Sequence, residues 1–213
     1  MIIGLLGFIN SGKGTVGDIL SKDYGFVKES FAKPVKDATA AIFGWDRELL
    51  EGETLASRTF REKEDAFWSE KFNKSFTPRK ALQLMGTEVG RDVFHPNLWV
   101  DALEKRLDKN KDYVITDVRF PNEMKMIQGV GGKIIRVKRG PEPEWYEDAH
   151  WENCGVSGLP KQILKNYPDV HYSEWAWIGF PIDKVIENDS DLSSLKEKVD
   201  NYINQEYNIQ SKV

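Results

Sequence analysis

Apolar residues along the chain fall into short clusters typical of buried strands and into spaced positions typical of helices. The first cluster, 1–6, predicts a strand, and apolar residues three and four apart predict a helix over 16–24. A second short strand is expected at 26–31, and a helix follows over 34–43, with glycine after each helix. This strand–helix–strand–helix order is typical of an α/β protein with a parallel sheet.

The same patterns recur in the rest of the chain. Residues 45–76 are dense in charge and predict a helical insertion, and residues 140–181, rich in tryptophan, are where a lid is expected. A helix that opens with Thr77 as its N-cap and Pro78 as its first residue is expected to end at Gly86-Thr87. The remaining expected elements are strands at 113–115, 133–139 and 183–188, and helices at 97–107, from 121 and over 192–203.

The loop after the first strand carries the clearest chemical signal. Residues 7–13 read GFINSGK, which is the Gly-x4-Gly-Lys spacing of a phosphate-binding P-loop. Glycines allow successive backbone N–H groups to approach anionic oxygens, and the next helix adds the positive end of its dipole. Gly14 stands where the simple motif has Ser or Thr, so Thr15 is the candidate Mg²⁺ ligand, directly or through water. The nucleotide-binding residues predicted from this loop are Gly7, Asn10, Ser11, Gly12, Lys13, Gly14 and Thr15.

Two further groups of polar residues follow predicted strands, and parallel sheets bind ligands at the carboxyl ends of their strands. Lys36, at a helix N-terminus after the second strand, is a candidate for a second anion, whereas Lys33 is interpreted as a surface lysine. Asp117 follows the strand at 113–115, and an acid there holds Mg²⁺ in P-loop enzymes. Arg119 is placed to clamp a phosphate. The alternative is that Asp117 caps the next helix or pairs with Arg119.

Composition limits the remaining possibilities. The 213 residues are enough for one α/β domain, and the net charge of −4 argues against a general nucleic-acid binder. A lone cysteine, Cys154, excludes a disulfide within the chain and a cysteine zinc cluster, which suits a reducing cytoplasm. His150 and His171 are too widely spaced to suggest a metal site. No apolar run approaches the roughly 20 residues of a membrane span, and a strand at the start leaves no room for a signal peptide.

Taken together and in this order, four short blocks resemble the deoxynucleoside monophosphate kinases of tailed bacteriophages, a branch of the P-loop nucleotide kinases. The blocks are the P-loop with its Gly-Lys-Gly-Thr ending, residues 32–37 (AKPVKD), residues 79–87 (RKALQLMGT) followed by Trp99-Val100, and residues 117–119 (DVR) with Glu123-Met124. A weaker fifth block contains His171, Ser173 and Glu174, and Asn188-Asp189 is similar to the family's adenine-side turn. Residues 45–75 match least.

The resemblance implies a P-loop NTPase-type parallel sheet flanked by helices, with an NMP-binding helical insertion and a lid, in one domain. Its core would comprise about 1–44, 77–139 and 182–205. The implied reaction transfers the ATP γ-phosphoryl group to a deoxynucleoside monophosphate, with ATP and Mg²⁺ bound and no nucleic-acid polymer or membrane as partner. A homodimer and a cytoplasmic location, in the host cell if the gene is phage-borne, are also implied.

The resemblance also assigns roles to individual residues. Lys13, Lys36, Arg79, Asp117 and Arg119 would form the catalytic group, with Arg91 as a further cation on the acceptor phosphate. Gln83, Gly86, Thr87 and Trp99 would contact the acceptor nucleoside, and Asn188 would lie near the adenine. Arg119 or Arg139 would cover the charge of the transition state.

Two other functions compete with this interpretation. A kinase of a nucleoside or coenzyme precursor would need a carboxylate base just after the second strand, where this chain has Ala32-Lys33-Pro34 and Lys36; these residues favour an anionic acceptor. A nucleotide-binding regulator or motor ATPase would share the P-loop, but the short chain and the second basic site argue against it. Turnover that requires a small acceptor would separate the kinase from the regulator.

Overall fold

A computed structural model describes residues 1–155 and 166–207 of the chain. The chain divides into two compact units, the first formed by Met1–Ser30 with Asp108–Val213 and the second by Phe31–Leu107. The second unit contains the expected insertion, 45–76, together with residues on both sides of it. Within residues 1–155 and 166–207, every helix is too short or too polar to cross a membrane.

The first unit is built on a five-stranded parallel sheet in the order β2-β3-β1-β4-β5. Central β1 pairs with β3, where Ile3 faces Val114, and with β4, where Ile3 faces Lys133. All carboxyl ends therefore lie at one edge, as the α/β prediction requires. Each strand lies where the hydrophobic pattern predicted one; the bounds are β1 Ile2–Leu6, β2 Val27–Glu29, β3 Tyr113–Ile115, β4 Lys133–Lys138 and β5 Lys184–Glu187.

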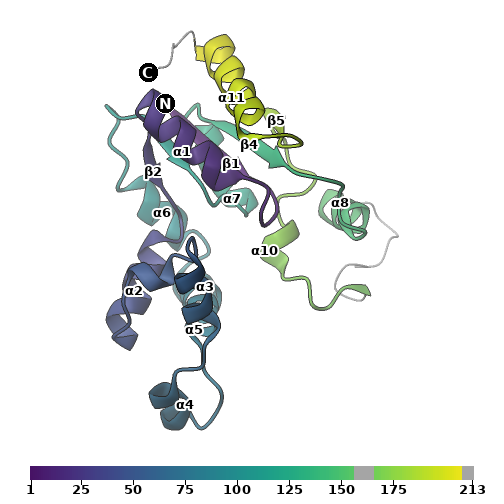
Figure 1. Ribbon diagram of the computed structural model, residues 1–213. Helices are drawn as coiled ribbons and strands as arrows, with labels where there is room; N and C mark the ends of the chain where they lie inside the picture. The colour runs from purple at the N-terminus through teal and green to yellow at the C-terminus, as the bar shows by residue number, and fades with distance from the viewer. Residues whose placement is uncertain (156–165, 208–213) are drawn as a thin grey trace. The chain divides into compact units, whose positions relative to one another are not determined.

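Helices cover both faces of this sheet. On one face, α1 (Lys13–Tyr24) and α11 (Leu192–Tyr207) lie side by side and share a core with the strands (Figure 1). On the other face, α7 (Pro121–Gly129) packs closely over β1, because a Cβ at Gly4 would lie 2.7 Å from Ile127 Cδ1. The predicted flanking helices are thus confirmed, although α1 begins three residues earlier than 16, directly at the P-loop lysine.

In the region 140–181, where the lid is expected, the described residues form two short helices. They are α8 (Tyr146–Cys154) and α10 (Tyr172–Trp175), and residues 156–165 between them lie outside the described part of the chain. Asn153 of α8 donates from Nδ2 to the carbonyl oxygens of Trp175 (2.9 Å) and Ile178 (2.8 Å), which ties α8 to the segment that contains α10. A role of this region as a lid stays a prediction.

The second unit is helical where the structure assigns regular elements, and its elements match the expected insertion and the helices around it. Side-chain caps open several of them: Thr77 Oγ1 accepts a hydrogen bond from Lys80 N (3.2 Å), as the sequence predicted. The elements are α2 (Lys33–Phe43), η1 (Glu48–Leu50), α3 (Leu55–Glu62), α4 (Ala66–Phe72), α5 (Pro78–Leu84), η2 (Met85–Phe94) and α6 (Leu98–Glu104).

The predicted break at Gly86-Thr87 is wrong, because the backbone continues as a π-helix, η2, to Phe94. The indole of Trp99 explains the continuation. Its Nε1 donates to Gly86 O (2.8 Å), and a Cβ at Gly90 would lie 2.4 Å from Trp99 Cζ2. Glycine therefore allows close packing against the tryptophan at this point rather than ending the helix.

Candidate active site

The P-loop has a backbone that only certain residues adopt easily. The φ angles of Gly7 (142°), Asn10 (63°) and Gly12 (105°) are all positive, a region that glycine adopts freely and asparagine tolerates. A Cβ at Gly7 would also lie 2.2 Å from Val137 O, so the loop backbone rests directly on β4. The hydroxyl of Ser11 is buried under the loop without a hydrogen-bond partner among the described residues.

Lys13 lies across this loop. Its Nζ donates to Gly7 O (2.6 Å) and Phe8 O (2.8 Å). Burial lowers the pKa of this lysine to about 8, and the charge of Arg119 adds to the effect, while Glu174 and Asp117 oppose it. The carboxylates of Glu174 and Asp117 thus do not fully offset the burial of the ammonium group and its repulsion by Arg119. An anion such as a phosphate is therefore favoured at this position.

Asn188, expected near the adenine, also holds the P-loop from the neighbouring strand. This side chain is buried at the end of β5, and its Nδ2 donates to Ser11 O (2.9 Å), while its backbone N donates to Lys138 O (2.7 Å). A Cβ at Gly12 would lie 2.5 Å from Asn188 Nδ2. The asparagine therefore stabilises the loop backbone through this hydrogen bond to Ser11 O, a contact that residue spacing did not predict.

Arg119 meets residues of the weaker fifth block. Its Nη1 donates to Ser173 Oγ (3.2 Å) and to Glu174 Oε1 (3.0 Å). The backbone N–H groups of Arg119 and Phe120 both donate to Glu123 Oε2, at 2.8 and 3.0 Å, and this buried carboxylate fixes the turn that presents the arginine. Sequence reasoning gave Glu123 and Glu174 no role, although a glutamate at the third helical position, here three residues after Phe120, is the half of the capping-box pattern that binds the N-cap N–H.

The predicted Mg²⁺ ligands occupy suitable places. Asp117 follows β3, next to central β1, and its charge acts on Lys13, so the carboxylate lies at the same edge of the sheet as the P-loop. Thr15 lies in the first turn of α1, half-buried. A hydroxyl and a carboxylate are the hard oxygen donors that Mg²⁺ prefers, so these residues fit the ion.

Two other residues predicted to bind the nucleotide are Gly14 and Arg139. At Gly14 a Cβ would meet no atom within 4 Å, and Arg139 is exposed beyond the end of β4.

In the second unit, two of the cations predicted to bind the acceptor phosphate are held by carboxylates. Lys36 Nζ donates to Glu51 Oε2 (2.5 Å), and Arg79 Nε donates to Glu62. Arg91 Nη1 donates to Pro96 O (3.3 Å). Both carboxylates come from the expected insertion, the part of the chain that matched the resembled family least.

The residues predicted to contact the acceptor nucleoside lie on consecutive elements. Gln83 is exposed on α5, and Gly86 and Thr87 follow in the π-helix. Trp99 is 8% exposed, and its N–H is occupied by the carbonyl of Gly86, so within this unit it serves as a packing residue. Stacking of Trp99 on a nucleoside stays a prediction.

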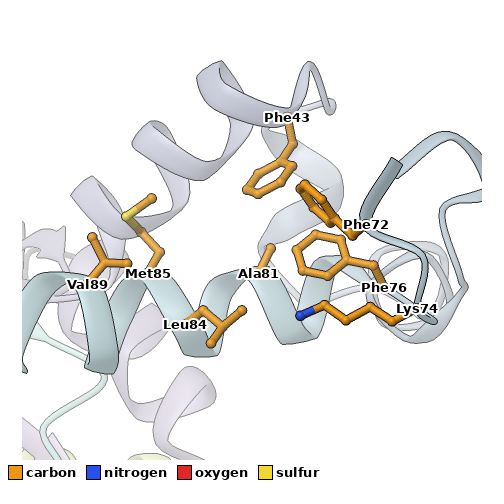
Figure 2. Close-up of a pocket in the computed structure, with 8 residues that line it drawn as sticks. All are labelled: Phe43, Phe72, Lys74, Phe76, Ala81, Leu84, Met85 and Val89. Carbon is orange, nitrogen blue, oxygen red and sulfur yellow. The ribbon is translucent and has the colours of Figure 1, made fainter. Parts of the chain in front are cut away.

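An apolar pocket of about 390 Å³ lies in the second unit (Figure 2). Figure 2 shows the rings of Phe43, Phe72 and Phe76 grouped at one end, with neighbouring ring centroids 4.9 to 5.4 Å apart. The full lining is Phe43, Phe72, Lys74, Phe76, Ala81, Leu84, Met85 and Val89. This lining suits an apolar group. It contains none of the residues predicted to bind the acceptor.

Comparisons with known proteins agree with this geometry. A family model described as deoxynucleotide monophosphate kinase matches residues 48–199. A putative deoxynucleotide monophosphate kinase of Acanthamoeba polyphaga mimivirus is 33% identical over 65% of this chain and 74% of its own length. The deoxynucleoside-5'-monophosphate kinase of Escherichia phage T5 is 30% identical over 60% of this chain and 72% of its own length.

A third relative extends the similarity over nearly the whole chain. The deoxynucleotide monophosphate kinase of Enterobacteria phage T4 is 25% identical over 94% of this chain and 97% of its own length. The family model and the relatives thus agree on one family, and the P-loop, the acid after β3 and the arginine two residues on lie together at one edge of the sheet. The chain belongs to the deoxynucleotide monophosphate kinase family.

Proposed function

We propose that this protein transfers the γ-phosphoryl group of ATP to a deoxynucleoside monophosphate, which yields ADP and the deoxynucleoside diphosphate. The observation that carries the proposal is the cradle of the P-loop. Its glycine-dependent backbone and the buried ammonium group of Lys13, held across the loop, suit a bound phosphate, in a chain of this kinase family. The reaction would take place in the cytoplasm, that of the host cell if the gene is carried by a phage.

On the donor side, the loop and Lys13 would hold the β- and γ-phosphates of ATP. Thr15 and Asp117 would hold Mg²⁺, which when bound neutralises phosphate charge. Asn188 keeps the loop backbone in place beneath the nucleotide. Arg119, fixed by Glu174 and Ser173, would stabilise charge on the transferred group, and Arg139 is the second candidate for that role.

On the acceptor side, the attacking atom is already an anionic phosphate oxygen, so the enzyme needs no general base. Repulsion between two anions is the main obstacle, and cations reduce it. We assign Lys36, Arg79 and Arg91 to the acceptor phosphate and Gln83, Gly86, Thr87 and Trp99 to its nucleoside. Lys36 and Arg79 would then exchange their carboxylate partners, Glu51 and Glu62, for the phosphate.

The direct test is an acceptor screen. Purified protein is incubated with ATP, Mg²⁺ and each of dAMP, dCMP, dGMP, dTMP and their ribose counterparts, and ADP and the diphosphate product are measured. We expect turnover with one or more deoxynucleotides and loss of it in Lys13→Ala protein purified in the same way. If none of the monophosphates raises ADP formation above the rate without acceptor, the proposal is wrong.

A further inference from the structure

Arg136 is a buried arginine that the proposed mechanism does not use. It lies on β4, opposite Leu6 of β1, and is only 6% exposed. A guanidinium group so deeply buried cannot reach a nucleotide. Removing such a group from water is costly, and an apolar side chain of the same volume often packs at least as well. The presence of an arginine here therefore calls for a reason other than packing.

Three aromatic rings surround the guanidinium. Its Cζ lies 4.9 Å from the ring centroid of Trp177, 5.1 Å from that of Tyr146 and 5.7 Å from that of Phe8. Such distances are those of cation–π contacts, which strengthen when the cation is desolvated. We call these four residues, Arg136 with its three rings, the arginine cage. They come from the P-loop, from β4, from α8 and from the segment after α10.

Polar contacts fix the arginine within the cage. Nη2 donates to Glu142 Oε2 (2.5 Å) and Nη1 donates to Tyr146 Oη (3.1 Å). Both partners lie after β4, in the region 140–181. The planar fork of arginine is thus fixed at two nitrogens while the guanidinium lies within cation–π distance of the rings, Phe8 included. Lysine offers neither the plane nor the fork.

Phe8 connects the cage to the phosphate-binding lysine. It is the second residue of the P-loop, and its carbonyl oxygen accepts from Lys13 Nζ (2.8 Å) and from Ser11 N (3.2 Å). The ring of Phe8 also packs against Trp145, with centroids 5.4 Å apart. Phe8 therefore contributes its ring to the cage and its carbonyl oxygen to the hydrogen bonds that hold the ammonium group of Lys13.

A second connection runs through Trp177. Its Nε1 donates to Glu174 O (3.0 Å), and the carboxylate of Glu174 pairs with Arg119 and acts on the charge of Lys13. Trp177 is 2% exposed, so its position is set by the cage and its neighbours. The cage thus reaches both the lysine and the arginine of the proposed site, along two separate routes.

We propose that Arg136 is a positioning residue of the kinase, which sets the P-loop through Phe8 and the Glu174–Arg119 pair through Trp177. The inference rests on the proposed function, because it assumes that the P-loop binds ATP. A residue that only stabilises the fold would change the melting temperature and leave the ATP affinity of the folded protein unaltered.

The test measures ATP affinity by calorimetry without any acceptor, in Arg136→Met, Arg136→Lys, Phe8→Leu and the double variant Arg136→Met with Phe8→Leu. Misplacement of a binding group by about 1 Å can cost on the order of 10²-fold, so we expect ATP binding to weaken about 10- to 100-fold in each single variant. We expect the double variant to be no weaker than Phe8→Leu alone, because both changes break one connection. The matched control is Lys133→Met, a cation on the same strand that pairs with Asp183 at the surface, and its affinity should stay within twofold of the wild type.

Hydrogen exchange of the nucleotide-free protein gives a readout independent of ATP. In Arg136→Met we expect faster exchange in the peptide covering 7–15 and unchanged exchange in α11. Should Arg136→Met fail to fold, Trp177→Phe replaces it, since it keeps an aromatic ring, although a smaller one, and removes the donor to Glu174 O.

The outcomes separate the two proposals. Wild-type protein that binds no ATP contradicts the proposed function. If the wild-type protein binds ATP and the folded variants bind it equally well, the role of Arg136 is overturned. The same holds if the effects of Arg136→Met and Phe8→Leu on ATP affinity add in full in the double variant.

Discussion

The P-loop and the acceptor cations of the helical unit are held in two different ways. Backbone conformation and buried partners hold the loop: Gly7 lies against Val137 O, and Asn188 is 9% exposed. Carboxylates hold Lys36 and Arg79 in the helical unit, and in the Arg79–Glu62 pair the side chain of Glu62 is 57% exposed. Exposed ion pairs contribute about 0–1 kcal/mol, so the second arrangement is easily exchanged.

The difference indicates a division of labour. If the proposed function holds, a preformed donor site would bind without rearrangement, whereas cations paired with carboxylates would bind an acceptor by exchanging one anion for another. Changes in the P-loop should therefore act on every substrate, and changes among the acceptor cations should act on the monophosphate alone. The following predictions test that comparison, from the largest expected effect to the smallest.

Replacing the P-loop lysine should have the largest effect. In Lys13→Ala the backbone cradle remains, but the cation that faces the phosphates is lost, so kcat/KM should fall on the order of 10²- to 10³-fold. Lys22→Ala, on the exposed side of the same helix, is the matched control and should keep the wild-type rate. Steady-state kinetics with ATP and the best acceptor checks this, and a fall below tenfold would show that Lys13 does not hold the transferred group.

Arg79→Ala should affect the acceptor alone. Losing a charged hydrogen bond costs about 1.5–3 kcal/mol, so KM for the deoxynucleoside monophosphate should rise about 10- to 100-fold while KM for ATP stays unchanged. Lys80→Ala, the next residue on α5, is the control for a loss of charge at the same surface. Equal increases in both KM values would contradict the division between donor and acceptor sites.

ATP affinity should depend on pH through Lys13. Burial lowers the pKa of this lysine to about 8 in the free protein, and a bound phosphate favours the charged form and raises it. Affinity should then be constant below pH 8 and decrease above it, by up to about tenfold per pH unit, as the free protein loses the proton. Calorimetric titrations from pH 7 to 9.5 measure this. In Lys13→Arg, whose guanidinium stays charged, the profile should be flat; a flat wild-type profile would rule Lys13 out as the titrating group.

The smallest effect is expected at the carboxylate that pairs with Lys36. Burial by itself would raise the pKa of Glu51, but hydrogen bonds and charge from Lys36 and Arg47 together outweigh it and hold the pKa below its usual range. Glu51 is therefore charged at neutral pH and would compete with an incoming phosphate. In Glu51→Gln, KM for the monophosphate should fall about two- to fivefold, the size of a weak ion pair near the protein surface. Glu53→Gln, two residues away and exposed, should leave KM unchanged. An increase in KM would mean that Glu51 positions Lys36 instead of competing for it.

Much of the fold was predictable because its signals are local. The five strands and the helices that follow Gly12, Ala32, Thr77 and Phe120 lie where apolar spacing and capping residues indicated. The error at Gly86 has a physical cause. Glycine usually ends a helix, but here the indole of Trp99 occupies the space that a side chain would need and binds the carbonyl of Gly86. That contact joins η2 and α6, and the helix propensities of the residues around Gly86 do not reveal it.

The sequence by itself determined the P-loop, since its strand, glycines, lysine and helix are consecutive and depend only on backbone conformation over 2–15. It also placed Asp117 and Arg119 at the same edge, because parallel strands align their carboxyl ends. Only the tertiary structure brought Glu174 to Arg119, Asn188 to Ser11 and the arginine cage to Phe8. These pairs are far apart in the chain, and their contacts depend on how helices and strands pack, which residue spacing alone does not specify.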